Sequence, residues 1–286
     1  METSKLEEQK AEVVVSKAKG IGGVNPRTHL EYMRIKAWMA YLMAKSGAVT
    51  YGDLNERLLS TRPKSQLKFM YKEEMGFPHV RWDKHWKLET GPNESRLNLI
   101  DKMPLGAGSK AVYEVGPQDN GVSIPLWLSF ETDFNLMWSL VDAVVADMPD
   151  MRKRGAPFAT RMECVISLFV PKAEWEQIDF KDPANHPKLH VVLAAYQAGH
   201  FEPSFKLLAA AMAMYRLVVN AGESMAQMEY LLRGLLGEPY RDLLSSYNIY
   251  TEFLAAFNQL EINDFISRGD LESAENILEK MRGEPL

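Results

Sequence analysis

Lysine recurs at one-turn spacing in the first third of the chain. Lys64, Lys68 and Lys72 stand at positions i, i+4 and i+8, so a helix over these residues would carry all three ammonium groups on one face. Such a row of cations neutralises the phosphates of a nucleic-acid backbone. Because lysines at this spacing are also common on the exposed faces of surface helices, a solvated face is the alternative interpretation.

Basic residues on both sides extend this row. The side chains that we expect to contact phosphates are Arg62, Lys64, Lys68, Lys72, Arg81, Lys84, Lys87, Arg96 and Lys110. Ser65 and Gln66, near the start of the same helix, are expected to reach base edges in the major groove of duplex DNA. Tyr71, Trp82 and Trp86 lie among the basic residues. Because aromatic rings stack on unpaired bases, single-stranded DNA or RNA is a further alternative, although core packing is the commoner role of such rings.

No pattern of catalytic residues accompanies these basic side chains. Residues 106–110, Gly-Ala-Gly-Ser-Lys, lack the first glycine of a phosphate-binding loop, and no hydroxyl residue follows the lysine. His186 and His190 have a spacing that suits a shared metal ion, but Pro187 is expected to begin a helix between them. Cys164 lies in an apolar run, which is typical of a buried and unreactive thiol. We therefore expect no enzyme, no cofactor and no metal, with an unrecognised enzyme whose pocket lies between two domains as an alternative.

Three helices are expected to position the lysines. Residues 28–46 place apolar side chains at three-to-four-residue spacing, which predicts a helix that Gly47 ends. Thr50 is expected to cap a second, short helix over 51–59, whose leucines face inward. The basic row then lies on a third helix over 63–74, because its first residue, a proline, suits a first helical turn.

A short strand is expected after these helices. Residues 93–102 predict a fourth helix, and residues 111–115 predict a strand that follows a glycine turn, with a loop over 117–125. Residues 77–104 separate the basic helix from this strand. The sequence leaves open whether this stretch belongs to the same domain or is an insertion.

In this order of elements, residues 28–116 resemble helix-turn-helix and winged-helix DNA-binding domains of the phage-repressor type. The resemblance rests on 46–58 as the first two helices, on 62–72 as the recognition helix and on 110–116 as the strand of the wing. A domain of this kind places its recognition helix in the major groove of duplex DNA. The resemblance therefore implies a DNA-binding regulatory protein.

The rest of the chain predicts an all-helical bundle. Helices are expected over 127–146, 189–198, 203–220, 224–236, 240–257 and 262–281. Residues 162–170 form a continuous apolar run that fits a buried strand as well as a helix. Residues 265–281 resemble one hairpin of a tetratricopeptide-like repeat, with a turn at Gly269 and close packing at Ala274. Because no period near 34 residues continues this hairpin, a bundle is expected and a solenoid is not.

The charge changes sign along the chain. Residues 1–110 contain 19 Lys and Arg against 13 Asp and Glu, a net charge of +6, and residues 111–286 contain 14 against 25, a net charge of −11. This separation predicts two surfaces with different partners. The first residues are charged, no window approaches the roughly 18 apolar residues of a membrane span, and a single cysteine excludes an internal disulfide. These features predict a cytoplasmic protein without membrane contact.

The sequence thus predicts a mainly α protein in three parts. Residues 1–27 are expected to form a flexible arm, residues 28–125 a helix-turn-helix domain with a small β wing, and residues 126–286 an all-helical domain. The predicted function is that of a DNA-binding regulator, whose basic helix contacts duplex DNA and whose acidic helices bind a second copy or another protein. The alternative is a non-enzymatic scaffold subunit of a larger protein complex.

Overall fold

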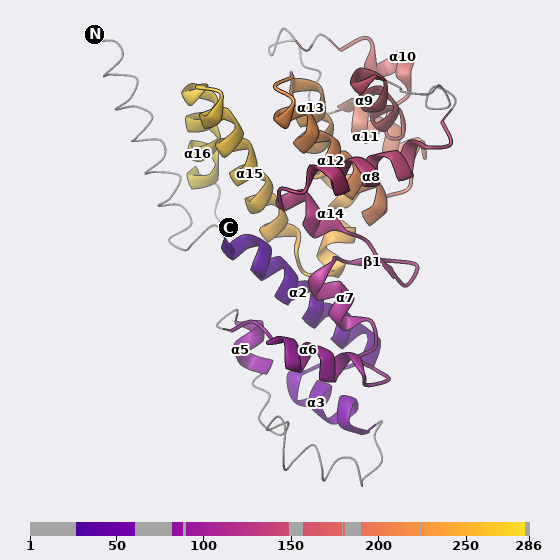
Figure 1. Ribbon diagram of the computed structural model, residues 1–286, viewed down its shortest axis with the longest axis vertical. Coiled ribbons are helices and arrows are strands. Elements are labelled where there is room, and N and C mark those ends of the chain that lie inside the picture. Colours follow the sequence, from indigo (N-terminus) through magenta and orange to yellow (C-terminus); the bar gives the residue numbers. More distant parts are fainter. Residues whose placement is uncertain are drawn as a thin grey trace, which may run out of the picture.

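The computed structural model is mainly α-helical and, in the part of the chain that it describes, contains one small two-stranded sheet (Figure 1). The described residues are 27–60, 82–87, 90–148, 157–178, 180, 190–223 and 225–283. No helix within these ranges has both the length and the apolar character needed to cross a membrane. The predicted fold class is confirmed. The predicted arm over residues 1–27 lies outside the described residues except for its last residue.

Two helices joined by a tight turn begin the described chain. α2 (Arg27–Ser46) ends at Gly47, whose φ of +67° is a left-handed conformation that glycine adopts without steric cost. Thr50 Oγ1 accepts a hydrogen bond from the amide of Asp53 over 3.2 Å and so caps α3 (Tyr51–Ser60). The first two predicted helices, the turn at Gly47 and the cap at Thr50 are confirmed.

Two further short helices complete a small core around α2 and α3. They are α5 (Trp82–Trp86) and α6 (Glu94–Asp101), and α6 confirms the helix predicted over 93–102. We call this core the tryptophan cluster; its buried members are Ile35, Trp38, Met39, Leu42, Leu54, Leu58, Leu59, Trp82, Leu97, Ile100 and Met103. The rings of Trp38 and Trp82 lie 5.6 Å apart, and the Trp38 side chain is fully buried.

The strand predicted over 111–115 is wrong. A helix, α7 (Ser109–Glu114), occupies this segment. The carboxylate of Asp101 accepts a 3.0 Å hydrogen bond from the amide of Lys110 and so satisfies an amide of the first turn, where no helical carbonyl is available. Val112 is fully buried in the core. These tertiary contacts override the strand preference of the valines and the tyrosine in this segment.

A hairpin follows α7, where the sequence predicts a loop. β1 (Gln118–Asp119) and β2 (Val122–Ser123) pair antiparallel, with Gln118 opposite Ser123. Asn120 (φ 50°) and Gly121 (φ 82°) form the turn, and two consecutive left-handed residues suit a two-residue hairpin loop. The strands of the described chain thus lie a few residues beyond the predicted wing strand.

The C-terminal helices surround one central helix, α12 (Phe205–Asn220), in which eleven of the sixteen residues are buried. The other elements are η2 (Leu126–Phe130, a 3-10 helix), α8 (Phe134–Val145), α9 (Phe158–Ser167), α10 (Lys172–Trp175), α11 (His190–Gln197), α13 (Ala226–Leu235), α14 (Glu238–Ser246), α15 (Tyr250–Ser267) and α16 (Leu271–Gly283). η2, α8, α9 and α13 pack against α12. This arrangement confirms the predicted helical character of the C-terminal part.

Three details differ from the predicted helices. Residues 131–133 divide the helix predicted over 127–146 into η2 and α8, because Asp133 accepts from the Leu136 amide over 3.1 Å and starts a new helix. Asn248, with a φ of 57°, divides the helix predicted over 240–257 into α14 and α15. The turn at Gly269 divides the helix predicted over 262–281 into the end of α15 and α16.

The apolar run 162–170 and the predicted C-terminal hairpin over 265–281 are also helical. The apolar run 162–170 lies in α9 and the turn after it, so the helix is the correct interpretation. In the predicted C-terminal hairpin, Gly269 has a φ of +78° and Ala274 is fully buried between α15 and α16.

α2 contributes to two hydrophobic clusters. Trp38 belongs to the tryptophan cluster, whereas Met33 and Ala37 belong to the larger cluster of the C-terminal helices. Val112 and Ile124 also join the larger cluster. Figure 1 shows the indigo α2 between the first part of α15 and the short helices α3, α5 and α6, and α2 packs against α15. The predicted domain division at residue 125 stays a prediction.

Candidate functional site

The structure describes four of the residues predicted to bind nucleic acid. They are Lys84, Lys87, Arg96 and Lys110, which lie on or beside α5, α6 and α7. The remaining predicted residues, Arg62, Lys64, Ser65, Gln66, Lys68, Lys72 and Arg81, lie outside the described residues. Their roles, and the basic helix that would carry most of them, stay predictions.

Arg96 forms a hydrogen-bond chain inside the fold. Its Nη1 donates to Nε2 of His85 over 2.7 Å, and Nδ1 of His85 donates to the carbonyl of Thr90 over 2.5 Å. Because a guanidinium can only donate, the imidazole of His85 carries its proton on Nδ1 and is neutral. The His85 side chain is buried and its ring lies 5.8 Å from that of Trp38. Burial also lowers the pKa of Arg96 below its usual value. The described contacts of Arg96 thus join α6 to α5.

Lys110 is bonded to the neighbouring helix as well. Its Nζ donates to Asn98 Oδ1 over 2.8 Å and lies 3.5 Å from a carboxylate oxygen of Glu114. Its amide is bound by Asp101, as described above. Lys110 therefore attaches α7 to α6, and its predicted phosphate contact stays a prediction.

Lys84 and Lys87 lie on the outer side of the tryptophan cluster. Lys84 is partly exposed and Lys87 is exposed. The helix that carries Lys84 is held in place by Trp82, whose Nε1 donates to Asn55 Oδ1 of α3 over 3.3 Å. Since Trp82 is buried, its ring packs in the core and offers no open face to a base. Trp82 therefore positions the two lysines.

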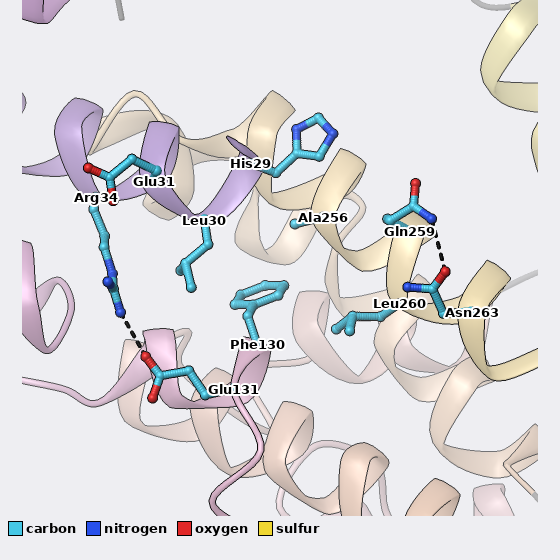
Figure 2. Close-up of a pocket in the computed structure, with 10 residues that line it drawn as sticks. All are labelled: His29, Leu30, Glu31, Arg34, Phe130, Glu131, Ala256, Gln259, Leu260 and Asn263. Atoms are coloured by element: carbon cyan, nitrogen blue, oxygen red, sulfur yellow. Dashed lines mark hydrogen bonds and ion pairs between the residues drawn. The ribbon is translucent and has the colours of Figure 1, made fainter. Parts of the chain in front are cut away.

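A cavity of about 680 Å³ lies between the start of α2, the end of η2 and the middle of α15 (Figure 2). Its apolar lining consists of Leu30, Phe130, Ala256 and Leu260, and its polar lining of His29, Glu31, Arg34, Glu131, Gln259 and Asn263. None of these residues is predicted from the sequence as part of a site, because they come from three segments far apart in the chain. None of these segments has a motif that could have indicated the cavity.

Ion pairs and hydrogen bonds order the polar side of the cavity. Arg34 Nη2 lies 2.7 Å from Glu131 Oε1, and the phenol of Tyr113 donates to Glu31 Oε1 over 2.5 Å. On the opposite side, Gln259 Nε2 donates to Asn263 Oδ1 over 3.1 Å. Figure 2 shows the Arg34–Glu131 pair and the Gln259–Asn263 pair on opposite sides of Leu30 and Phe130.

The environment of His29 favours its neutral form. Burial lowers the pKa of His29 below 6.5, and the nearby carboxylate of Glu252 opposes this shift without cancelling it. Glu252 itself forms an ion pair with Lys36, which joins α2 to α15 beside the cavity. At neutral pH the lining therefore contains an uncharged imidazole.

A second group of charged residues is buried between α12, α13 and α15. Glu261 is fully buried and its Oε2 accepts from Arg233 Nη2 over 2.7 Å, while Asp264 Oδ2 accepts from the phenol of Tyr215 over 3.0 Å. Arg216 Nη1 lies 3.8 Å from Asp264 Oδ1. Burial raises the pKa of Asp264 above its usual value, and the hydrogen bond from Tyr215 and the charge of Arg216 counteract it. These contacts fix α15 against the central helix.

The remaining reactive side chains of the sequence analysis have ordinary surroundings. Cys164 is 4% exposed, which confirms its predicted burial. His190 is exposed, and His186 lies outside the described residues. Within the described ranges, no three His, Cys, Asp or Glu side chains converge to hold a metal ion.

Comparison with known proteins gives no relative for this arrangement. No family model matches the chain, and no curated protein and no solved structure is significantly similar to it.

Proposed function

We propose that the N-terminal part of the chain binds duplex DNA, and that the C-terminal helices bind a second copy or another protein. The observation that carries this proposal is the pair α2 and α3, two helices joined at Gly47 with the second capped by Thr50. The pair lies within a segment, residues 1–110, whose net charge is +6. Helix pairs of this kind are a common means of presenting a helix to the major groove.

The arrangement of α5 supports the proposal. Trp82 and His85 anchor this helix in the tryptophan cluster, and Lys84 and Lys87 then face outward. In this proposal Arg96 and Lys110 are supporting residues that hold α6 and α7 in place. Lys84 and Lys87 would neutralise phosphates beside the predicted lysines of residues 64–72.

The charge of the C-terminal part supports a protein partner. Residues 111–286 have a net charge of −11, which opposes contact with a phosphate backbone. Association through these helices would bring two N-terminal units onto one DNA site, and two linked contacts bind much more tightly than one.

The experiment that tests the proposal is binding of the full-length chain to a fluorescently labelled random duplex across a salt series. We expect the affinity to fall steeply with salt, because each neutralised phosphate contributes about 0.9 to the slope of log K against log salt. Replacing Lys64, Lys68 and Lys72 by alanine should reduce that slope, and the pair Lys84→Ala and Lys87→Ala should reduce it further. The matched control is Lys172→Ala with Lys206→Ala, which removes two exposed lysines of the acidic part.

If the control pair lowered the salt slope as much as Lys84→Ala with Lys87→Ala, the result would contradict the proposed interface. If the full-length chain does not bind duplex DNA even at low salt, the scaffold function is favoured. The scaffold function is supported by the bonds of Arg96 to His85 and of Lys110 to Asn98, because these two predicted phosphate contacts already have partners within the fold.

A further inference from the structure

An open groove of about 840 Å³ lies between one face of α14 and the connection from α11 to α12. On α14 its lining consists of Pro239, Asp242, Leu243 and Ser246, whose spacing of i, i+3, i+4 and i+7 places them on one face of the helix. Residues of the stretch 196–203 form the opposite wall. The groove therefore belongs to the acidic C-terminal helices, for which we propose a protein partner.

A buried side chain joins the two walls. The amide of Ser204 donates to the phenol oxygen of Tyr240 over 3.4 Å, and this phenol donates to the carbonyl of Ser204 over 3.2 Å. Because Tyr240 is fully buried, these bonds connect α14 firmly to the end of the α11–α12 connection. A groove whose walls are already fixed binds a partner with a small ordering cost.

The apolar surface of the groove contains aromatic and proline rings. The rings of Tyr196 and Phe201 lie 5.7 Å apart, and the Phe201 ring is held by an edge-on contact with Phe169 at 5.2 Å. Pro239 and Leu243 of α14 continue the surface on the other wall. Grooves lined by aromatic rings are typical binding sites for proline-containing segments in the extended polyproline II conformation.

The groove carries negative charge that its lining does not offset. Glu202 and Asp242 line it, and both are exposed. Among the residues that the structure describes, neither carboxylate has an ion-pair or hydrogen-bond partner, and no lysine or arginine lines the groove. Arg241 of the same helix lies over the ring of Tyr250, 5.9 Å from its centroid. Two carboxylates without a cation beside an apolar surface favour a basic partner.

We propose that this groove binds a basic, proline-containing segment of a partner protein in an extended conformation. The proline and aliphatic side chains of the segment would lie on the rings of Tyr196 and Phe201, and its arginines would meet Glu202 and Asp242. The net charge of −11 over residues 111–286 opposes contact with a second acidic surface. This inference rests on the proposed binding of another protein by the C-terminal helices and names the chemistry of that partner.

The test is isothermal titration of the full-length chain, at low ionic strength, with three peptides. The first is acetyl-Pro-Arg-Pro-Leu-Pro-Arg-Pro-amide. The second replaces both arginines by citrulline, which keeps their shape and removes their charge, and the third replaces the prolines by alanine. We expect the first peptide to bind and the citrulline peptide to bind at least about fivefold more weakly. The alanine peptide should bind several-fold more weakly, because its free chain is not already extended.

A double variant locates the peptide in the groove. Glu202→Gln with Asp242→Asn should weaken the arginine peptide to the affinity of the citrulline peptide, whose own affinity should not change. The matched control is Glu272→Gln with Glu279→Gln, which removes two exposed carboxylates of α16. Figure 1 shows α16 at the edge of the molecule, apart from α14, so the preference for arginine should persist in this control.

The groove and the DNA interface fail separately. The titration contains no nucleic acid, and Glu202→Gln with Asp242→Asn should leave the salt slope of DNA binding unchanged, because that slope is assigned to the N-terminal part. A loss of peptide binding therefore leaves the DNA proposal standing, and a chain that does not bind DNA can still bind the peptide.

Four results would overturn the inference. They are the absence of arginine-peptide binding at millimolar concentrations, equal affinity for the arginine and citrulline peptides, and an unchanged preference for arginine in the groove variant. The fourth is a self-association in sedimentation velocity that the groove variant abolishes, which would assign the groove to a second copy of the chain. The first two comparisons use the unaltered chain, so they remain decisive if a variant fails to fold.

Discussion

Arg96 and His85 are joined by a 2.7 Å hydrogen bond from the guanidinium Nη1 to the imidazole Nε2, and this bond connects α6 to α5, the helix that carries the partly exposed Lys84. Nδ1 of the same imidazole donates a hydrogen bond to the carbonyl of Thr90. A basic residue that the sequence suggests as a phosphate contact therefore has a structural partner.

We predict that Arg96→Ala lowers the free energy of unfolding by about 1.5–3 kcal/mol, the usual cost of removing a hydrogen bond to a charged group. The loss arises because the substitution removes the bond by which α6 is held to the buried His85 of α5. Urea denaturation followed by circular dichroism measures it, with the exposed Lys102→Ala as the control. An unchanged stability together with a reduced salt slope of DNA binding would instead make Arg96 a phosphate contact.

We predict that His29 makes the protein less stable in acid. Its folded-state pKa lies below 6.5, so the unfolded chain binds more protons between these two values. The contribution of His29 is therefore fully present above about pH 6.5 and is lost as the pH falls through the folded-state pKa. Urea denaturation at pH 7 and pH 5 should show a larger loss for the unaltered chain than for His29→Gln. Equal losses would contradict this assignment.

Gly234 of α13 lies against Val192 of α11, and we predict that Gly234→Ala is destabilising. A Cβ at this position would lie 2.7 Å from both the Cβ and the Cγ2 of Val192, and Val192→Ala removes the second of these contacts. Overpacking of this kind costs about 1–3 kcal/mol, which exceeds the gain of about 1 kcal/mol from a better helix former. Thermal unfolding of Gly234→Ala, Val192→Ala and the double variant tests the contact. The double variant should be more stable than the sum of the two single effects implies, and strict additivity would contradict the clash.

Asp264 carries a desolvation cost that we expect to be measurable. Burial raises its pKa above the value of 3.8 expected for an unfolded chain, so the folded state binds more protons between these values. Its ionised form therefore opposes folding as the pH rises through the folded-state pKa. Asp264→Asn keeps an acceptor for the phenol of Tyr215 and removes the charge. Its stability relative to the unaltered chain should be higher at pH 7 than at pH 4.5.

The measurement for Asp264 is guanidinium denaturation of both proteins at the two pH values. Tyr215→Phe is the matched control, because it removes the hydrogen bond and leaves the carboxylate. A variant Asp264→Asn that is less stable than the unaltered chain at pH 7 would show that Arg216 outweighs desolvation.

Local signals in the sequence were sufficient for part of the fold. Gly47 and Thr50 predict the turn between α2 and α3, because a left-handed residue and a capping hydroxyl act within a few residues of their position. The strand predicted over 111–115 was wrong for the opposite reason: the amide of Lys110 is satisfied by Asp101, nine residues away. Strand propensity depends on the residue types of the segment itself and takes no account of such a distant partner.

The candidate sites show the same limit. The lysines could be selected by charge and spacing, but the internal role of Arg96 depends on His85, whose burial results from packing against Trp38 and Trp82. The cavity depends on α2, η2 and α15 being adjacent, and this adjacency is a property of the tertiary fold. Its polar residues have no common spacing along the chain.

The sharing of α2 between two hydrophobic clusters has a consequence for cooperativity. One face of this helix is covered by the tryptophan cluster and another by the C-terminal helices. Melting of either cluster would expose apolar surface of the same helix, so the amide hydrogens of α2 should exchange with solvent only in the openings of highest free energy. A fragment ending near residue 125 would leave Met33, Ala37 and Val112 uncovered, and its aggregation would report the missing half of the core.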